Sequence, residues 1–253
     1  LSCLSDCSGY DFGSCEYETT EGLVAYYPFN GNADDESGNG NGGTVSGVTY
    51  ATDYPTYNLT GDGSPTSGYF DGDDYITIPS GITSGANSIS IWIYSTDWGS
   101  GPTDGTNIIG PKTDGAQPND RHYFRIDSDG TIYDFDGTSP IIAEDTWYHF
   151  VIIDDISTKK YYINGMYSGY GTRQNWNPGI AGMICKDTSY GSECIGYVDE
   201  VTIYDRALNS TEISNLYNYG IITGETTYQG CIDSNASNYD ASANVDNGSC
   251  TYD

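Results

Sequence analysis

The chain is poor in basic residues: 8 Lys+Arg stand against 36 Asp+Glu, which gives a formal net charge of -28 over 253 residues. Such a field repels phosphate backbones and anionic lipids, so we expect no binding to nucleic acid or to a membrane surface. No apolar run approaches the ~20 residues that a spanning helix needs, so we expect no membrane insertion. An initiator Met and a signal peptide are also missing, and we expect Leu1 to be a processed or excised start.

Histidine is scarce as well, and the two residues present form no Ser/His/Asp or Cys/His arrangement. His149 lies inside the apolar run 147–153, where we expect a packed core histidine. Tyrosine, by contrast, is abundant, with 25 residues against 6 Phe and 4 Trp. Tyrosine suits half-exposed sheet faces, interfaces and sugar stacking, although β-propensity alone also favours it.

Seven cysteines in an acidic, Gly-rich chain indicate an oxidising compartment. We therefore predict a secreted protein, at a cell-surface appendage or in a matrix. Glycosylation is expected at the sequons of Asn58, Asn235 and Asn247, but not at Asn209, which we expect to cap a helix. The expected disulfides are Cys185–Cys194, Cys231–Cys250 and Cys15 with Cys7 or Cys3. One cysteine is left over, for a reactive thiol or a bond to another chain.

Residues 22 to about 220 alternate short β-like runs with Gly/Asp/Asn turns. In 88–94, Ile89, Ile91 and Ile93 follow the two-residue period of a half-buried strand. Residues 161–167 predict a hairpin with Asn-Gly at its tip, and 123–133 predict a second hairpin. The nearly all-apolar run 146–153 predicts a central strand covered on both faces. Together these patterns predict an all-β, two-sheet antiparallel sandwich.

One short helix is expected after Asn209, which can act as the N-cap while Glu212 closes a capping box. An apolar stripe follows, and Gly220 supplies the stop. Because the helix is only about three turns long, we expect it to pack onto the sandwich.

The two ends of the chain carry a similar phrase, Gly-Ser-Cys-x-Tyr at 13–17 and at 248–252. We predict three parts: an N-terminal Cys-rich segment (1–21), a β-sandwich (22–222) and a C-terminal Cys/Asp-rich repeat (223–253). Matching ends suggest a unit built for a linear array.

Five ordered blocks resemble the laminin-G-like domains of the concanavalin A-like lectin/glucanase superfamily: 22–41, 70–79, 147–151, 162–165 and 196–208. The resemblance implies a jelly-roll of two antiparallel sheets. Residues 230–252 are similar to short Cys/Asp repeats of secreted multidomain proteins. Glucanases of this superfamily use a Glu-x-Asp-x-Glu strand, which occurs nowhere in this chain. We therefore predict no catalytic residues and no enzyme activity.

A calcium site is the first candidate, since Asp34, Asp35 and Asn39 offer oxygen ligands in a Gly-rich turn. The resemblance implies that this loop meets Asp199 at one edge of the sandwich around a structural Ca2+. The alternative is that these residues only satisfy turn geometry.

A second loop, 233–237, has Asp, Asn and Ser at alternate positions, as in the first ligands of an EF-hand. Asn238 stands where that loop needs Gly, so we expect a disulfide-closed cluster of turns instead. For sugar binding, Trp98 and Trp176 lie in Gly-rich loops, where they are either exposed for stacking or folded back over the core edge.

The leading functional prediction is a structural or adhesive subunit of an extracellular assembly, a surface filament or matrix. Its partners would be further copies of the chain or other extracellular proteins, and assembly would depend on ions because of the negative charge. The alternative is a carbohydrate-binding, lectin-like module of a larger secreted protein, with glycans as its partners.

Overall fold

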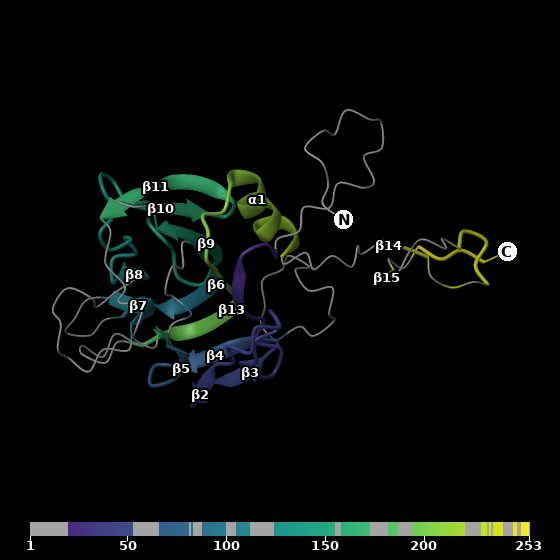
Figure 1. Cartoon of the computed structure of the whole chain (residues 1–253), viewed down its shortest axis with the longest axis horizontal. Coiled ribbons are helices and arrows are strands. Elements are labelled where there is room, and N and C mark those ends of the chain that lie inside the picture. The colour runs from purple at the N-terminus through teal and green to yellow at the C-terminus, as the bar shows by residue number, and fades with distance from the viewer. Residues whose placement is uncertain are drawn as a thin grey trace.

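The structure is a computed structural model. It describes residues 20–52, 66–80, 82, 88–99, 105–111, 124–154, 158–172, 182–186, 194–220, 229–231, 233, 235–239, 245–246 and 249–252. These residues form two antiparallel sheets with one short helix, and a small unit at the C-terminal end (Figure 1). The predicted two-sheet sandwich is confirmed.

The large sheet has eight strands in the order β11-β10-β9-β6-β13-β4-β3, with β1 pairing to β13 beside this path. Its strands are β1 (Leu23–Tyr27), β3 (Thr49–Ala51), β4 (Ser67–Asp71), β6 (Ser88–Asp97), β9 (Trp147–Asp154), β10 (Thr158–Ile163), β11 (Met166–Thr172) and β13 (Ile195–Tyr204). In Figure 1 this sheet runs from β11 at the top to β3 near the bottom. Strands far apart in the chain are therefore neighbours in its centre.

The small sheet has five strands in the order β2-β5-β12-β7-β8. These are β2 (Thr44–Ser46), β5 (Tyr75–Ile78), β7 (Gly105–Pro111), β8 (Phe124–Asp127) and β12 (Gly182–Ile184). The second predicted hairpin forms only in part. Phe124–Asp127 makes β8, but Ile132 pairs with Ile126 through an isolated bridge rather than a strand.

The main core lies between the sheets and is built by the inward side chains of alternating residues. Ile89 and Ile91 are fully buried there and Ile93 is 1% exposed, as their period predicts. We call the opposite face of the large sheet, which points away from the small sheet, the outer face. The strand β9 contributes to both faces, since Phe150 joins the main core and Val151 joins a second cluster on the outer face.

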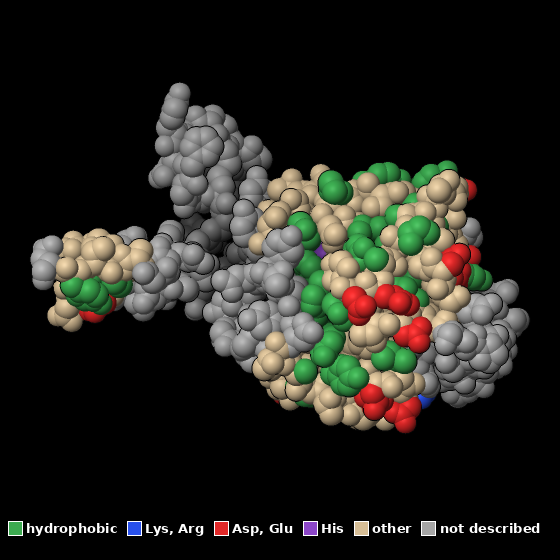
Figure 2. All heavy atoms as spheres, turned by 180° about the vertical axis from the view of Figure 1, so that it is seen from behind, with side chains coloured by type: hydrophobic (Ala, Val, Ile, Leu, Met, Phe, Trp, Pro, Cys, Tyr) green, Lys and Arg blue, Asp and Glu red, His purple; other side chains and the backbone are tan. Residues whose placement is uncertain are grey.

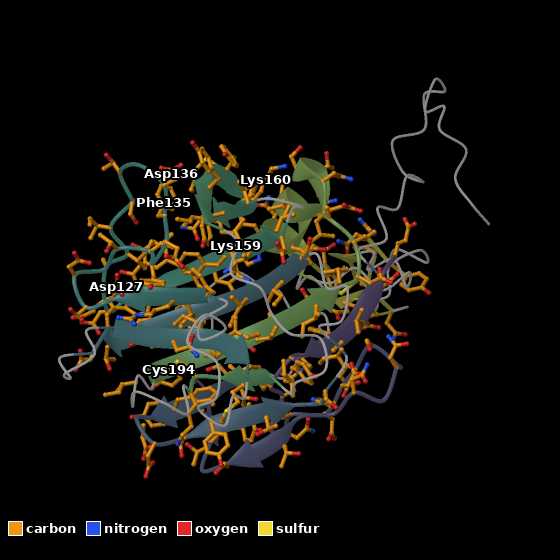
Figure 3. All side chains as sticks on the ribbon, turned by 60° about the vertical axis from the view of Figure 1, so that its left-hand side comes forward. Asp127, Phe135, Asp136, Lys159, Lys160 and Cys194 are labelled. Carbon is orange, nitrogen blue, oxygen red and sulfur yellow. A yellow bond between two sulfur atoms is a disulfide. The ribbon has the colours of Figure 1, made fainter. Side chains whose placement is uncertain are left out.

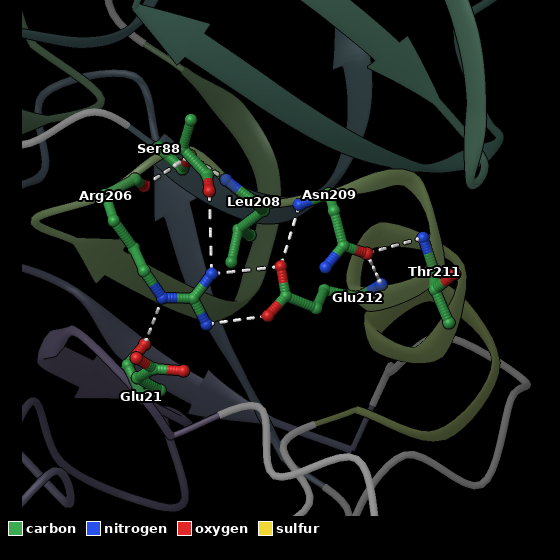
Figure 4. Close-up of polar contacts among 8 residues, drawn as sticks. Glu21, Ser88, Arg206, Leu208, Asn209, Thr211 and Glu212 are labelled. Atoms are coloured by element: carbon green, nitrogen blue, oxygen red, sulfur yellow. Dashed lines mark hydrogen bonds and ion pairs between the residues drawn. The ribbon is translucent and has the colours of Figure 1, made fainter. Parts of the chain in front are cut away.

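Helix α1 (Ser210–Tyr219) supplies that second cluster and has the predicted cap. The Asn209 side chain accepts hydrogen bonds from the backbone N–H groups of Thr211 and Glu212, at 2.9 and 3.0 Å. The Glu212 carboxylate accepts from the Asn209 N–H at 2.7 Å and forms an ion pair with Arg206 at 2.7 Å (Figure 4). Gly220 follows the helix with a positive φ of 69°. The helix packs its apolar side on one part of the outer face, in a cluster of Val151, Ile153, Tyr204, Leu208, Ile213 and Leu216.

The predicted hairpin between β10 and β11 turns at Asn164 and Gly165, whose φ values are 50° and 76°. Both residues adopt the left-handed conformation that the Asn-Gly pair tolerates, so this prediction is confirmed. No helix among the described residues is long and apolar enough to cross a membrane.

The C-terminal unit consists of the short parallel pair β14 (Gln229–Gly230) and β15 (Val245–Asp246), with adjoining turns. Among the described residues there are two disulfides, Cys185–Cys194 in the sandwich and Cys231–Cys250 in this unit. Both pairs are those expected from the sequence. Cys3, Cys7 and Cys15 lie outside the described residues, as do Asn58, Asn247 and Trp176.

Candidate functional site

The outer face of the large sheet has two halves, of which α1 covers one. On the other half, one aromatic residue from each of four neighbouring strands stands in register. Each alternates along its strand with a residue of the main core, so its side chain projects from the outer face. We call these residues the aromatic strip: Tyr69 on β4, Tyr197 on β13, Tyr94 on β6 and Trp147 on β9.

The four rings contact one another across the strands. Centroids lie 5.0 Å apart for Tyr69 and Tyr197, 5.8 Å for Tyr197 and Tyr94, and 5.8 Å for Tyr94 and Trp147. Strands spaced by ~4.8 Å bring directly opposed side chains into this range. All four side chains remain partly exposed, so the strip is a continuous aromatic surface that solvent can reach.

On the side that faces the helix, the strip borders a buried group two residues further along β6 and β9. The Trp92 ring stacks on Tyr217 of α1 at 5.6 Å and contacts His149 at 5.1 Å. The His149 Nε2 atom hydrogen-bonds the Ser90 hydroxyl at 2.7 Å, and burial lowers the pKa of His149 to about 3. His149 is therefore neutral in ordinary buffers and packs as a core histidine, as predicted.

Away from the helix, the strip borders polar residues. The Tyr94 hydroxyl donates a hydrogen bond to the exposed Asp145 carboxylate at 3.2 Å. The Asp145 backbone is held in turn by the Ser95 carbonyl at 2.8 Å, so the carboxylate has a defined position. Thr96, two residues beyond Tyr94 on the same strand, is exposed.

An acidic group begins at the last residue of β4 and continues into the turn that follows. Carboxylate oxygens of Asp71, Asp73 and Asp74 lie within 4.8 Å of one another, and no other such trio of His, Cys, Asp or Glu occurs among the described residues. Burial raises the pKa of Asp74, and the charges of Asp71 and Asp73 add to this shift. Asp71 follows Tyr69 by two residues on β4, so the group lies next to the strip. Three carboxylates at this distance could bind a metal ion.

Two of the residues predicted to bind calcium, Asp35 and Asn39, form hydrogen bonds with nearby backbone groups. The Asp35 carboxylate accepts hydrogen bonds from the backbone N–H groups of Tyr26, Ser37 and Asn41, at 2.9, 2.9 and 2.8 Å. Burial opposes ionisation, but these bonds hold the pKa of Asp35 below its usual value. Asn39 donates its amide hydrogens to backbone carbonyl groups, at 2.9 Å to Leu23. Asp35 and Asn39 thus organise the turn.

Asp34 and Asp199 are not grouped with Asp35 in the described structure, and the calcium site predicted from these residues stays a prediction. Asp34 is exposed, whereas Asp199 is buried on β13 and accepts a hydrogen bond from the Glu200 N–H at 3.0 Å. The three carboxylates are not within ligand distance of one another in the described structure. What links the two regions is Tyr26, whose hydroxyl donates to Glu200 at 2.8 Å.

Of the two alternatives predicted for Trp98, the structure shows the ring folded back over the core edge. Its side chain is only 2% exposed and joins the main core, and its Nε1–H donates to the Ile142 carbonyl at 2.9 Å. Burial with a satisfied indole N–H corresponds to the folded-back alternative. Trp98 therefore presents no ring face to a sugar.

The C-terminal loop forms a cluster of turns rather than an ion-binding loop. Asp233 accepts hydrogen bonds from the Asn235 backbone at 2.8 Å and from the Tyr252 hydroxyl at 2.7 Å. Asn238 bridges the carbonyl of Ser249 and the N–H of Thr251, both at 2.8 Å. Ser249, Thr251 and Tyr252 of the second Gly-Ser-Cys-x-Tyr phrase thus hold this unit together.

Sequence reasoning did not single out the aromatic strip. Its only sequence signal is an aromatic residue at the outward position of each strand. Recognising it requires the pairing of β4, β13, β6 and β9, which are not consecutive in the chain.

Residues 70–214, more than half of the chain, match the laminin-G-type family model of the Concanavalin A-like lectin/glucanases superfamily. No curated protein matches the sequence. Among solved structures, the chain is similar to Domain 4 of AbnA, a GH43 extracellular arabinanase from Geobacillus stearothermophilus, in complex with arabinotriose. The TM-score is 0.59 at 21% identity, over 77% of this chain and 98% of that domain.

Two further structures share the fold. The binding domain of Paraclostridial Mosquitocidal Protein 1 gives a TM-score of 0.55 at 16% identity, over 79% of this chain and 53% of that one. The Trypanosoma rangeli sialidase gives 0.53 at 15% identity, over 78% of this chain but only 32% of the enzyme. At these identities the likeness shows the fold alone. The family match, which covers more than half of the chain, shows that the chain belongs to the concanavalin A-like lectin/glucanase superfamily.

Proposed function

We propose that the sandwich is a carbohydrate-binding module whose ligand lies on the aromatic strip. The observation that carries this proposal is the row of four partly exposed rings, Tyr69, Tyr197, Tyr94 and Trp147, on the half of the outer face that α1 leaves open. Buried rings would only add to a core. Rings that solvent reaches offer stacking surface to a ligand.

The chemistry of the strip suits a sugar. The C–H face of a sugar ring packs on an aromatic face, while carboxylates accept hydrogen bonds from sugar hydroxyls. Asp145 stands beside Tyr94 in a fixed position and provides such an acceptor. An apolar surface with few placed polar groups is typical of small-molecule sites.

The comparisons support the lectin-like alternative better than the assembly subunit. The similar arabinanase domain is described in complex with arabinotriose, and the chain covers nearly all of it. Self-association has no observation in its favour among the described residues and stays a prediction. We further propose a binding role without hydrolysis, because the chain lacks the Glu-x-Asp-x-Glu strand.

We also propose a secreted location. Disulfides persist in oxidising compartments, and the structure contains two of them. Among the predicted glycosylation sites, Asn235 is exposed in the C-terminal unit, so a glycan there would have room.

A glycan array tests the binding proposal. The wild-type protein should bind at least one oligosaccharide, and the variants Tyr94→Leu and Trp147→Leu should lose most of that signal while keeping an apolar side chain. The control is Tyr133→Leu, which removes a tyrosine that is 38% exposed outside the strip. Equal loss in all three variants, or an array silent for the wild type, would contradict the proposal.

Calcium is a second candidate ligand, favoured by the Asp71–Asp73–Asp74 group, where a cation would relieve the repulsion among three carboxylates. Calorimetric titration of calcium into chelator-treated protein tests it. If the group binds, Asp73→Asn removes the heat and Asp35→Asn does not. The reverse result would favour the loop of Asp34, Asp35 and Asn39, and no heat in the wild type would exclude both.

A further inference from the structure

We infer that the ligand of the aromatic strip is an uncharged, linear oligosaccharide rather than an acidic one. This inference rests on the proposed function and specifies its ligand class. It follows from the length of the strip, the charges beside it and the positions of the basic side chains.

The strip is longer than one sugar. Four strands spaced by ~4.8 Å place the outermost strand axes about 14 Å apart. The rings of Tyr69 and Trp147 stand at its two ends. A monosaccharide in contact with one tyrosine would leave the rest of the aromatic strip uncovered. A chain of several sugars lying across the strands would cover it.

The charges beside the strip are negative. The Asp145 carboxylate accepts a hydrogen bond from the Tyr94 hydroxyl, and Asp71, Asp73 and Asp74 lie beyond Tyr69. These carboxylates accept hydrogen bonds from hydroxyl groups but repel the carboxylate or sulfate of an acidic sugar. Figure 2 shows one face of the molecule, where, among the side chains coloured by type, Asp and Glu recur among hydrophobic side chains and Lys or Arg is visible only at one edge.

The described basic side chains are engaged away from the strip. Arg125 pairs with Asp127 at 2.9 Å, and the Lys186 ammonium lies 4.5 Å from the Tyr75 ring; both are in or beside the small sheet. Arg206 pairs with Glu212 at the start of α1.

The two lysines of β10 are also unsuited to hold an anion at the strip. Lys159 is only 1% exposed (Figure 3). Lys160 pairs in register with Ile153. Ile153 is six residues from Trp147 along β9, so Lys160 stands about 20 Å from that end of the strip. Among the described residues, none of these cations lies where it could neutralise an acidic sugar on the four rings.

Calorimetry with matched neutral and acidic ligands tests the inference, with chelator present so that no divalent cation bridges the charges. The pairs are galactotriose with trigalacturonate and lactose with sialyllactose, together with arabinotriose and cellotriose as further neutral probes. We expect a neutral trisaccharide to bind more tightly than its monosaccharide, with a Kd that hardly changes between 20 and 500 mM NaCl. The acidic counterpart should bind at least about tenfold more weakly at 20 mM NaCl, and this gap should narrow at 500 mM.

The variant Asp145→Asn adds an independent readout, since it keeps the size of the side chain and removes one charge. It should improve the relative affinity for the acidic ligand. If an acidic ligand binds as tightly as its neutral partner, and Tyr94→Leu abolishes that binding, the ligand class is wrong while the proposed function stands. If neither class binds the wild-type protein, both fail.

Discussion

Burial decides what each polar side chain of the outer face can do. His149 lies on β9 and is 1% exposed under Tyr217, while Asp145 lies in the bend that precedes β9 and is open to solvent. A buried imidazole loses its affinity for protons, whereas the oxygens of an exposed carboxylate can accept hydrogen bonds from a ligand. The first is therefore part of the packing and the second is part of the candidate site.

The pKa of His149 predicts a loss of stability in mild acid. Its folded pKa is about 3, below the ordinary 6.5, so only the unfolded chain takes up the proton between these values. The stabilisation is complete above pH 6.5 and falls as the pH drops towards 3. Between pH 7.5 and pH 5 the loss should be about 2 kcal/mol, measured by urea unfolding. The variant His149→Gln should lose much less unfolding free energy over this pH range. Equal losses in the variant and the wild type would show that His149 does not cause the pH dependence.

At the scale of helices, strands and turns, the sequence predicts those structures that are stabilised by interactions between residues close together in the chain. The capping box of Asn209 and Glu212 and the Asn164-Gly165 turn depend on residues close together in the chain, and both form. The aromatic strip depends instead on strand order and register, which no local pattern contains. The calcium site predicted around Asp35 stays a prediction, since the structure shows only that the backbone N–H groups of Tyr26 on β1 and of Ser37 and Asn41 in the turn donate to the Asp35 carboxylate.

The spacing of the strip depends on Gly196, which precedes Tyr197 on β13. Its φ is 144°, and a Cβ at this position would overlap the Tyr94 carbonyl oxygen on β6. Gly196→Ala should therefore force these strands apart, lower the free energy of unfolding by about 2 kcal/mol or more, and weaken glycan binding.

Gly137→Ala is the matched control, because its φ of 90° is also positive but nothing lies within 4 Å of an added Cβ. Chemical denaturation of both variants separates the cost of the backbone conformation from the cost of the clash. Equal costs would show that the contact between β13 and β6 is not tight.

At the scale of the whole molecule, the amino-acid composition has more effect on which partners the protein can bind than on how the chain folds. The net charge of -28 opposes compaction and repels anionic ligands, while it leaves the alternation of buried and exposed residues unchanged. The same charge therefore bears on stability, on the choice of ligand and on any contact between copies.

Salt should accordingly stabilise the protein. Screening acts over a Debye length of about 10 Å at 0.1 M, so raising NaCl from 20 to 500 mM should reduce self-repulsion and raise the Tm by several degrees. The scan is done with chelator present, and KCl should give the same rise. A Tm that stays constant or falls would mean that the negative charges are already compensated within the fold.

The most direct test of the central claim is NMR mapping of a bound neutral oligosaccharide, with the aromatic side chains isotopically labelled. If the ligand lies on the aromatic strip, the largest chemical-shift changes on titration fall on Tyr69, Tyr94, Trp147 and Tyr197, while Tyr133 and the C-terminal Tyr239 and Tyr252 stay unchanged. Largest changes in the C-terminal unit, or at residues of the small sheet, would contradict a binding site on the aromatic strip.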